Sequence, residues 1–520
     1  MLRPSLNRFH TYDEIQSYLF AARDAYPALM QLSELARTED DRVIWGVTLS
    51  RGRADNHPAF YVQGGVHAEE GMGVTGALNF LHTVLENPSL LDQVTIYILP
   101  CVNPDGSDAC VRTGLGLRSK TEPRAGIPNA LVPHDLNGDG KILSMRWPDP
   151  LGVWKTAPGC GDMLVPRVPG DTDGPFYSMC TEGMIENYDG GTIVSGTRGL
   201  DFNRQYADTW RDAENGGDYP GRHAEPRAVM EFLTTHPNIF AAIDLHCGTR
   251  ALIYGTPANT ADAALIKRIA LLCRDVTGIE PVPCGDYGRP DGSAPTVLPG
   301  HFETYCYESL GILAATVELG NGYNSLGMTA REIFNADLYG EALIARLTAL
   351  HAARGRAIAD PWVPYRHPQL GDVEIGGRVY GNAYFMDPDD MIDLLPKVAD
   401  YLLRLAAMAP TLTLGNVACD ALGAGIVRVR AEVMNTGVLG TNVMQGSAGY
   451  HAHRDAVRFT LSGAKEILSR PAMPAVSALR SMERTGAEWF IRAEPGDKLT
   501  VTVSHPKAGY ASVSVLVPAV

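Results

Sequence analysis

The stretch AFYVQGGVHAEEGMGVTGALNFLHTVLE, residues 59–86, joins a predicted strand to a predicted helix through a turn that carries a histidine and two acids. Its first eight residues form an apolar run with two glycines near the end, which is typical of a buried strand. The helix is predicted by apolar residues that recur on one face, namely Val74, Ala77, Leu78, Leu81 and Leu85. The stretch therefore predicts a sheet covered by helices, with polar side chains at the end of a strand.

The same alternation continues through the first two thirds of the chain. Further strands are predicted at residues 42–50, 93–103, 238–248 and 310–320, with helices at 11–32 and 224–236. Residues 114–200 are rich in Gly, Pro and Asp, which predicts long loops there. Strands that alternate with helices indicate an α/β fold with a mixed central sheet and helices on both faces.

The pattern changes near residue 359 and again near Thr411. Short alternating strands between turns follow Thr411, as in IVRVRAEVMNTG and KLTVTVSH, and they predict an all-β sandwich. We therefore expect three parts: an α/β domain at 1–358, a bridging segment with a helix at 359–409, and a β-sandwich domain at 410–520.

Bulk properties exclude several classes of partner. The 520 residues carry a net charge of −15, which argues against a nucleic acid or an anionic membrane as the partner. Nine cysteines without a CxxC pair, and an N-terminus without an apolar signal core, lead us to expect a reduced, cytoplasmic chain. They make no prediction of the oligomeric state.

The turn in the opening stretch offers half of a metal site. His67 and Glu70 are three residues apart at a strand end, so both side chains can reach one point in space. His246 also ends a buried apolar strand, and the carboxyl ends of strands are where open α/β sheets bind ligands. Two imidazoles and a carboxylate are a ligand set that Zn²⁺ accepts. Taken singly, each histidine is more often a structural residue than a metal ligand.

Further motifs strengthen the metal interpretation. LPCVNPDGSD, RGLDFNRQY, DLHCG and GILAATVELG follow the histidine motif in that order. Together they resemble the zinc carboxypeptidase family, the carboxypeptidase A-like metallopeptidases, over roughly residues 8–355. The β-rich tail is similar to the extension of a bacterial branch of that family. The resemblance implies a zinc carboxypeptidase-like catalytic domain at 1–358.

The resemblance implies a role for each residue of the metal site. His67, Glu70 and His246 would bind one Zn²⁺ per chain, and Asp201 would orient the first histidine. A carboxylate on the second ring nitrogen of a ligand histidine fixes its tautomer, so this role is chemically reasonable.

The resemblance also implies the groups that handle the substrate. Glu318 would be the general base, because a carboxylate must take a proton from the attacking water and deliver it to the leaving amine. Asn203 and Arg204 would hold the terminal carboxylate, to which a guanidinium can donate two hydrogen bonds. Arg118 is preferred as the stabiliser of the carbonyl oxygen, with Arg124 and Arg146 as alternatives.

Two positions depart from the family pattern. Glu69 stands where the family usually has an arginine, and it is either a solvated acid at a helix N-terminus or a group that alters substrate placement. The position of the substrate-capping tyrosine falls on Thr296 by gapless counting, and Tyr287 is a candidate replacement.

By gapless counting back from Glu318, Glu303 falls at the position that lines the pocket for the terminal side chain in the family, so the resemblance implies this place for it. A buried carboxylate there would favour a terminal Lys, Arg or another amine-bearing residue. The alternative is that Glu303 points to solvent or pairs with an arginine such as Arg289.

The motif DLNGDGKILSMR raises the possibility of a second cation. Asp135, Asn137 and Asp139 match the first half of a Ca²⁺ loop, but Arg146 stands where the bidentate glutamate belongs. A turn built from Asp and Gly is the alternative.

These observations predict a zinc-dependent metallocarboxypeptidase that acts on a peptide or peptide-like substrate with a free C-terminus. One alternative is a zinc amidase or deacylase acting on a small N-acyl amino acid or a cell-wall peptide. Another is a non-catalytic module that binds zinc or peptide, although such a module would need no general base.

Overall fold

The centre of the molecule is a mixed eight-stranded sheet. The computed structural model describes residues 3–124, 126–210, 215–255, 257, 259–287, 298–378, 387–444, 454–476 and 478–519. The strands of the central sheet, in spatial order, are β1 (Met30–Arg37), β2 (Val43–Leu49), β4 (Thr95–Leu99), β3 (Ala59–Gly64), β14 (Ile239–His246), β17 (Leu313–Leu319), β15 (Arg250–Tyr254) and β16 (Glu280–Pro283). The four strands β4, β3, β14 and β17 run parallel. β2 and β15 pair with this group antiparallel, and the outermost strands β1 and β16 pair antiparallel with β2 and parallel with β15, respectively. The predicted α/β fold class is confirmed.

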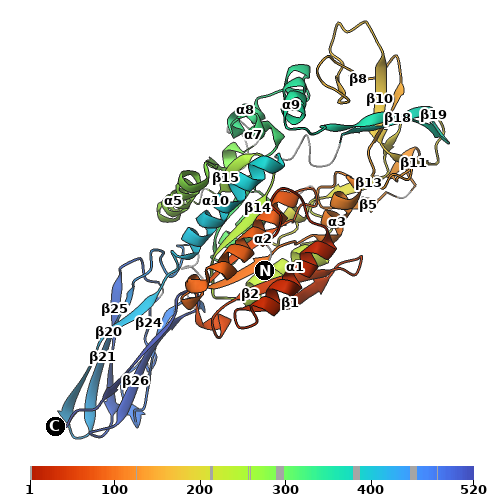
Figure 1. Cartoon of the computed structure of the whole chain (residues 1–520). Helices are drawn as coiled ribbons and strands as arrows, with labels where there is room; N and C mark the ends of the chain where they lie inside the picture. The colour runs from red at the N-terminus through yellow and green to blue at the C-terminus, as the bar shows by residue number, and fades with distance from the viewer. Residues whose placement is uncertain are drawn as a thin grey trace.

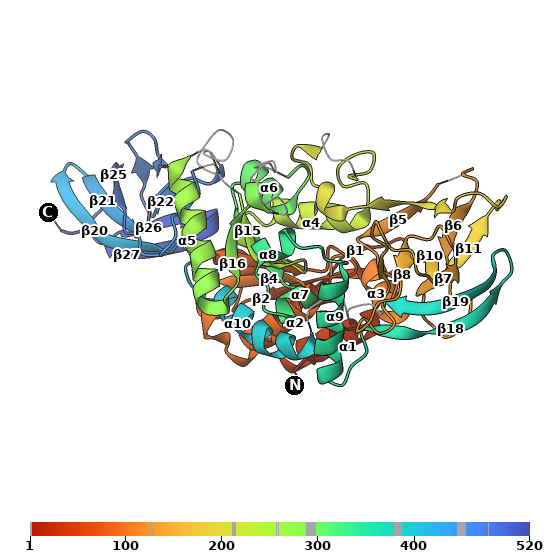
Figure 2. The ribbon, with the colours of Figure 1, turned by 90° about the horizontal axis from the view of Figure 1, so that it is seen from above.

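Helices cover both faces of this sheet, as Figures 1 and 2 show. One face packs against the helices α1 (Tyr12–Ala25), α2 (Gly71–Glu86), α5 (Thr260–Thr277) and α10 (Pro388–Ala406). The other face packs against α4 (Ala224–Thr235) and an irregular helical segment made of α6 (Phe302–Thr304) and a π-helical turn (Tyr305–Ser309). Side chains of β3 and β14 pack into a buried layer on each face of the sheet, so every residue of these two strands is buried.

Residues 114–200 contain more regular structure than the predicted loops. They begin after α3 (Pro104–Thr113) and include β5 (Lys120–Pro123), β6 (Ala130–Pro133), β7 (Ser144–Pro148), β8 (Trp154–Lys155), β9 (Val165–Pro166), β10 (Phe176–Thr181), β11 (Gly183–Glu186), β12 (Val194–Ser195) and β13 (Thr197–Leu200). These strands have two to six residues between Gly- and Pro-rich turns, too short for a periodic signal in the sequence.

The segment 359–409 does more than connect two domains. Its strands β18 (Ala359–His367) and β19 (Gly371–Arg378) join the sheet of β7, β10, β8 and β9. Its helix α10 packs against α2 and α5, and its apolar residues belong to the main core. Both parts of this segment therefore complete layers that the first 358 residues begin.

The C-terminal part is a sandwich of two four-stranded sheets, at the opposite end of the molecule from β7–β10 (Figure 1). One sheet contains β20 (Leu412–Gly423), β21 (Ile426–Asn435), β25 (Arg484–Arg492) and β23 (Glu466–Ile467). The other contains β24 (Ala475–Val476), β22 (Val457–Ser462), β26 (Lys498–His505) and β27 (Gly509–Leu516). Side chains that alternate between buried and exposed fill the space between the sheets around Trp489.

Among the described residues, no helix combines the length and the apolar character needed to cross a membrane.

Candidate metal centre

Three parallel strands bring the predicted site residues to one edge of the sheet. In the pairing of β14 with β17, His246 lies opposite Glu318, and in the pairing of β14 with β3, Leu245 lies opposite Gly64. His67 follows β3 three residues later, in the turn that leads into α2. The site therefore lies at the carboxyl ends of the strands, as predicted.

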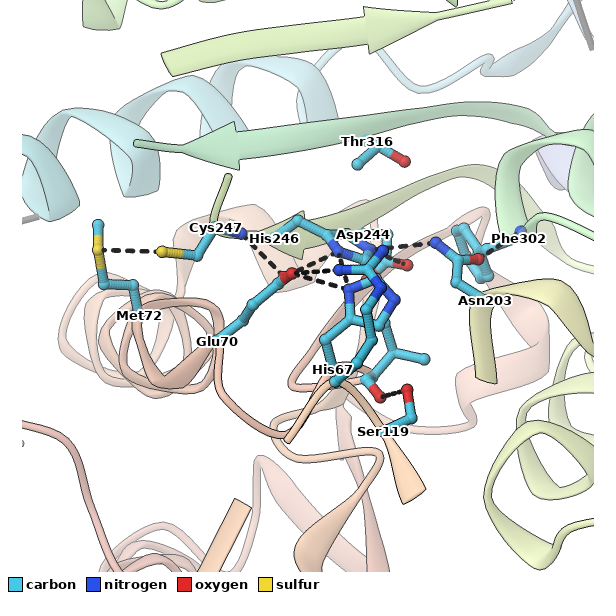
Figure 3. Close-up of polar contacts among 12 residues, drawn as sticks. His67, Glu70, Met72, Ser119, Asn203, Asp244, His246, Cys247, Phe302 and Thr316 are labelled. Carbon is cyan, nitrogen blue, oxygen red and sulfur yellow. Dashed lines mark hydrogen bonds and ion pairs between the residues drawn. The ribbon is translucent and has the colours of Figure 1, made fainter. Parts of the chain in front are cut away.

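The side chains of His67, Glu70 and His246 point toward one another at this edge (Figure 3). Nδ1 of His67 lies 2.8 Å from Oε1 of Glu70, and Nδ1 of His246 lies 2.9 Å from Oε2 of the same carboxylate. The two Nδ1 atoms are 3.0 Å apart. All three residues are buried, and one ligand atom from each lies within 4.8 Å of the others.

The outer nitrogen of each histidine faces an aspartate. Nε2 of His67 lies 3.0 Å from Asp201, and Nε2 of His246 lies 2.8 Å from Asp244. When each Nε2 carries the proton, both Nδ1 lone pairs converge on the Glu70 carboxylate. Two lone pairs and a carboxylate at such distances need a cation between them, so this donor set fits Zn²⁺.

The pKa shifts of Asp201 and His246 indicate that the carboxylates of the site favour a positive charge between them. Burial opposes ionisation of Asp201, but His67 and Arg118 outweigh it and hold the pKa of this carboxyl well below its usual range. Burial likewise opposes the protonation of His246, yet Asp244 and Glu70 raise its pKa well above the usual value. Protons and metal ions therefore compete for the same nitrogen atoms.

Asp244 is a site residue that the sequence analysis missed. It stands two residues before His246 on β14, so both side chains project from the same face of the strand. The sequence signal that could have identified Asp244 is the motif DLH, in which an aspartate stands two residues before the histidine. The backbone amide of Cys247 also donates to Glu70 Oε2 at 2.9 Å, which holds this carboxylate in place.

Glu318 is a second buried carboxylate beside the three candidate ligands. Its Oε2 atom has no hydrogen-bond partner among the described residues. Burial, reinforced by the charge of Glu70, raises the pKa of Glu318 to about 7. A carboxyl group that titrates near neutrality is suited to accept and return a proton.

Arg118 lies at the outer edge of the site. Its Nε donates to Asp201 at 3.0 Å and its Nη1 donates to Glu70 at 3.3 Å, while the side chain remains 47% exposed. Of the three arginines considered from the sequence, the structure brings Arg118 to the ligands. Arg146 instead pairs with Glu374 and packs between two aromatic rings.

Asn203 and Arg204 follow Asp201 in a short 3-10 turn (Phe202–Arg204). The Asn203 amide donates to His301 Nε2 at 2.9 Å, and its oxygen accepts a bond from the backbone amide of Phe302. Arg204 Nη1 donates to the backbone oxygen of Asn203 at 2.8 Å. His301 is a neighbour that the sequence analysis did not identify, because nothing in its local sequence connects it to Asn203.

Glu303 is only 5% exposed, so the alternative that it points to solvent was wrong. Thr316 donates to its Oε2 at 2.7 Å, and His301 Nδ1 lies 3.8 Å from its Oε1. Burial raises the pKa of Glu303 to about 7. The other suggested partner, Arg289, lies outside the described residues, as does Thr296.

A family model described as zinc carboxypeptidase matches residues 15–161 and 163–337, more than half of the chain. The chain belongs to the zinc carboxypeptidase family. This agrees with the resemblance stated from the motifs. A second model, described as a domain of unknown function, matches residues 411–516 of the sandwich.

Individual relatives of this zinc carboxypeptidase family member are distant. Carboxypeptidase B of Astacus astacus is 28% identical over 102 residues, which cover 19% of this chain and 33% of that protein. Carboxypeptidase A1 of Mus musculus is 23% identical over 253 residues, which cover 47% of this chain and 46% of that protein. The matches thus span between a third and a half of these relatives.

Among solved structures, carboxypeptidase A from Helicoverpa armigera matches with a TM-score of 0.44 and 13% identity, over 77% of this chain and 74% of that chain.

Two departures from the family pattern can be placed in the structure. Glu69 is partly exposed and lies two residues before the start of α2, and its backbone amide donates to the backbone oxygen of Leu117 at 3.0 Å. The hydroxyl of Tyr287 approaches the Glu318 side of the site: a Cβ atom added to Gly248 would lie 2.8 Å from this hydroxyl and 3.0 Å from Glu318 Oε2.

The Asp-rich loop forms a turn, which supports the alternative to a Ca²⁺ site. Both carboxylate oxygens of Asp135 accept backbone amides of the loop, from Gly138 at 2.8 Å and from Gly140 at 2.9 Å. Asn137 and Asp139 accept backbone amides two residues ahead in the same way. In the described part of the chain, the only cluster of such ligands is the one at His67, Glu70 and His246.

Proposed function

We propose that this chain is a zinc-dependent metallocarboxypeptidase that hydrolyses C-terminal peptide bonds, with Glu318 as the general base. The observation that carries the proposal is the Glu318 carboxyl itself. It is buried beside the candidate ligands, one oxygen has no hydrogen-bond partner among the described residues, and its pKa is raised to about 7. A purely structural metal site would need no such group.

His67, Glu70 and His246 would hold the zinc ion. When bound, zinc would supply Lewis acidity to the carbonyl group and to a water molecule at the open coordination position. Glu318 would then take a proton from the attacking water and return it to the departing amine.

Arginine side chains would neutralise the charges of the substrate. Arg118 is held by two carboxylates but remains half exposed, so it has donors left for the carbonyl oxygen on which negative charge develops. Arg204 would pair with the terminal carboxylate of the peptide. Glu303 would lie at the terminal side chain and favour a Lys, an Arg or another amine-bearing residue.

The same chemistry would serve a zinc amidase or deacylase on a small N-acyl amino acid or a cell-wall peptide. The buried carboxylate of Glu303 favours an amine-bearing terminal residue in either case. Release rates from free peptides and from N-acyl amino acids with the same terminal residue would separate the two substrate classes.

The general-base role is tested with Glu318→Gln. We expect this variant to keep its zinc and its fold but to release terminal amino acids at least about a hundredfold more slowly, because glutamine cannot accept the proton. Release is measured by mass spectrometry on a defined peptide mixture, with and without a chelator. Glu225→Gln is a matched control, because Glu225 is buried in α4 and its pKa is also raised to about 7. Near-full activity in Glu318→Gln would rule out Glu318 as the base.

A further inference from the structure

The sandwich contacts the catalytic part through a buried lysine. Lys507 lies in the turn (Pro506–Ala508) between β26 and β27, and it is only 1% exposed. Its Nζ donates to the backbone oxygens of Gly311 at 2.6 Å and Leu310 at 3.4 Å, and it lies 3.0 Å from Asp455 Oδ2. These three contacts match the three donors of an ammonium group. A buried charge is tolerated only with such complete compensation.

The two carbonyl groups, those of Leu310 and Gly311, directly follow the helical segment that contains Glu303. We call residues 302–309 the Glu303 segment. Its last turns close through bonds from Gly311 N to Tyr307 O and from Ile312 N to Cys306 O. The carbonyl groups at the end of a helical segment carry partial negative charge, so a cation at that end stabilises it.

A second cation from the sandwich reaches the same end. Arg454 donates to the oxygen of Leu310 at 3.2 Å, and two of its nitrogens pair with the carboxylate of Asp455. Asp455 is fully buried and therefore joins Arg454 and Lys507 into one unit. The unit belongs to the sandwich, and its two cations, Arg454 and Lys507, are 144 and 197 residues from Leu310 in the chain.

Tyr307 of the Glu303 segment has a second, indirect connection to the sandwich, through Asp262 of α5. The hydroxyl of Tyr307 donates to Asp262 Oδ2 at 2.7 Å, and the backbone amide of Met444 donates to Asp262 Oδ1 at 2.9 Å. Met444 lies beyond β21 in the sequence of the sandwich. The sandwich thus reaches the segment at two places, directly through Lys507 and Arg454 and indirectly through Asp262.

We propose that Lys507 is a positioning residue, through which the sandwich holds the Glu303 segment and thereby the pocket for the terminal side chain of the substrate. The start of this segment contacts the catalytic core through Asn203 and Thr316. Its end is held by Lys507, so the segment is fixed at both ends. The effect on substrate choice rests on the proposed carboxypeptidase function, whereas the effect on the segment itself does not.

The test compares Lys507→Met with wild type by hydrogen exchange and mass spectrometry on the zinc-loaded full chain. We expect amide exchange in peptides covering residues 303–312 to rise at least about tenfold, because a charge-assisted bond that closes the segment is lost. Exchange in β14, β26 and β27 and the zinc content should stay unchanged. Lys465→Met, which removes an exposed sandwich lysine paired with Glu494, is the control.

Further variants keep the test decisive. Lys507→Arg should restore most of the protection of residues 303–312 against amide exchange. If Lys507→Met does not fold, Arg454→Met replaces it in the test and should give a smaller rise in exchange over the same residues. Unchanged exchange at 303–312, or an equal rise throughout the chain, would contradict the proposal. The ratio of turnover on peptides ending in Lys and Leu should fall in Lys507→Met but not in Lys465→Met. If wild type releases no terminal residue, the proposed function fails while the exchange result still tests the segment.

Discussion

Asp201 and Asp244 decide which nitrogen atoms of the two candidate ligand histidines face the metal position. Each aspartate occupies one Nε2 atom, so the Nδ1 atoms are left to converge with Glu70. Arg118 in turn forms an ion pair with Asp201, which favours the ionised form of this carboxyl. The chemistry of the site therefore depends on carboxylates behind the ligands as much as on the ligands themselves.

Metal content tests the ligand assignment directly. We expect about one zinc per purified wild-type chain and almost none in His67→Ala or His246→Ala, because two ligands cannot retain the ion against solvent. Elemental analysis measures the content. His82→Ala serves as a control, since His82 is a buried histidine of helix α2 that lies outside the cluster. Unchanged zinc in both ligand variants would refute the assignment.

The raised pKa of Glu303 predicts that substrate preference depends on pH. Below about pH 7 the buried carboxyl is neutral, and above it the carboxylate is charged and attracts a cation. The turnover ratio of Lys-ending to Leu-ending peptides should therefore rise roughly tenfold from pH 6 to pH 8. The ratio removes effects common to both substrates, such as the titration of Glu318.

Glu303→Gln should make this ratio low and independent of pH, whereas Glu225→Gln should behave as wild type. A wild-type ratio that stays flat, or one that Glu303→Gln leaves untouched, would show that Glu303 does not set the preference.

At the scale of elements, glycines allow β3, α2 and β14 to meet closely enough to form the site. A Cβ atom at Gly64 would lie 2.4 Å from the backbone oxygen of Gly73, and one at Gly73 would lie 2.3 Å from the backbone oxygen of Leu245. Backbone atoms cannot move aside as a flexible side chain can. The approach brings Glu70, which precedes α2, to His246 at the end of β14.

Gly73→Ala should therefore disturb both the packing and the metal site. We expect a loss of about 1–3 kcal/mol in the free energy of unfolding, as for other overpacked positions, together with weaker zinc binding. Gly76→Ala in the same helix is the matched control, because its Cβ would lie 3.3 Å from a leucine side chain and helix propensity favours alanine by up to ~1 kcal/mol. Urea unfolding and zinc titration measure both effects, and equal losses in the two variants would contradict the explanation.

At the scale of the whole molecule, one core connects segments that are far apart in the chain. The main cluster of buried apolar residues includes side chains of α2, β14, α10 and the sandwich residues Leu439 and Val443. The candidate metal cluster joins two of these parts, because Glu70 is the N-cap of α2 and His246 ends β14. Its two histidines are 179 residues apart in the chain. A ligand that binds only the folded state should therefore stabilise the entire α/β part of the chain.

Zinc removal should accordingly lower the thermal midpoint of unfolding. With free zinc about a thousandfold above its dissociation constant, the stabilisation lost on chelation would be about 4 kcal/mol. Calorimetry with and without chelator measures the shift, and His67→Ala should unfold at the lower temperature in both conditions. A wild-type midpoint that is indifferent to the chelator would mean that the site does not hold a metal in the folded protein.

The sequence by itself determined the α/β class, the sandwich and the candidate ligands. These features rest on short-range patterns: apolar periods of two and 3.6 residues, glycine turns, and the HxxE spacing of His67 and Glu70. Strand ends could also be placed from the sequence, and parallel strands that share a sheet must end at one edge. That rule predicted that His246 lies at the same edge as His67. The ordered motifs, through their resemblance to the family, identified Glu318 as the candidate general base.

Only the tertiary structure decided which other residues complete the site. It brings Arg118 to Asp201 and Glu70 and pairs Arg146 with Glu374. It also places Asp244 behind His246, Glu303 against Thr316, and Lys507 of the sandwich at the end of the Glu303 segment. It also showed strands where residues 114–200 had predicted loops. Each of these results depends on pairing between segments distant in the chain. Local periodicity carries no information on such pairing, because register and burial are set by the whole fold.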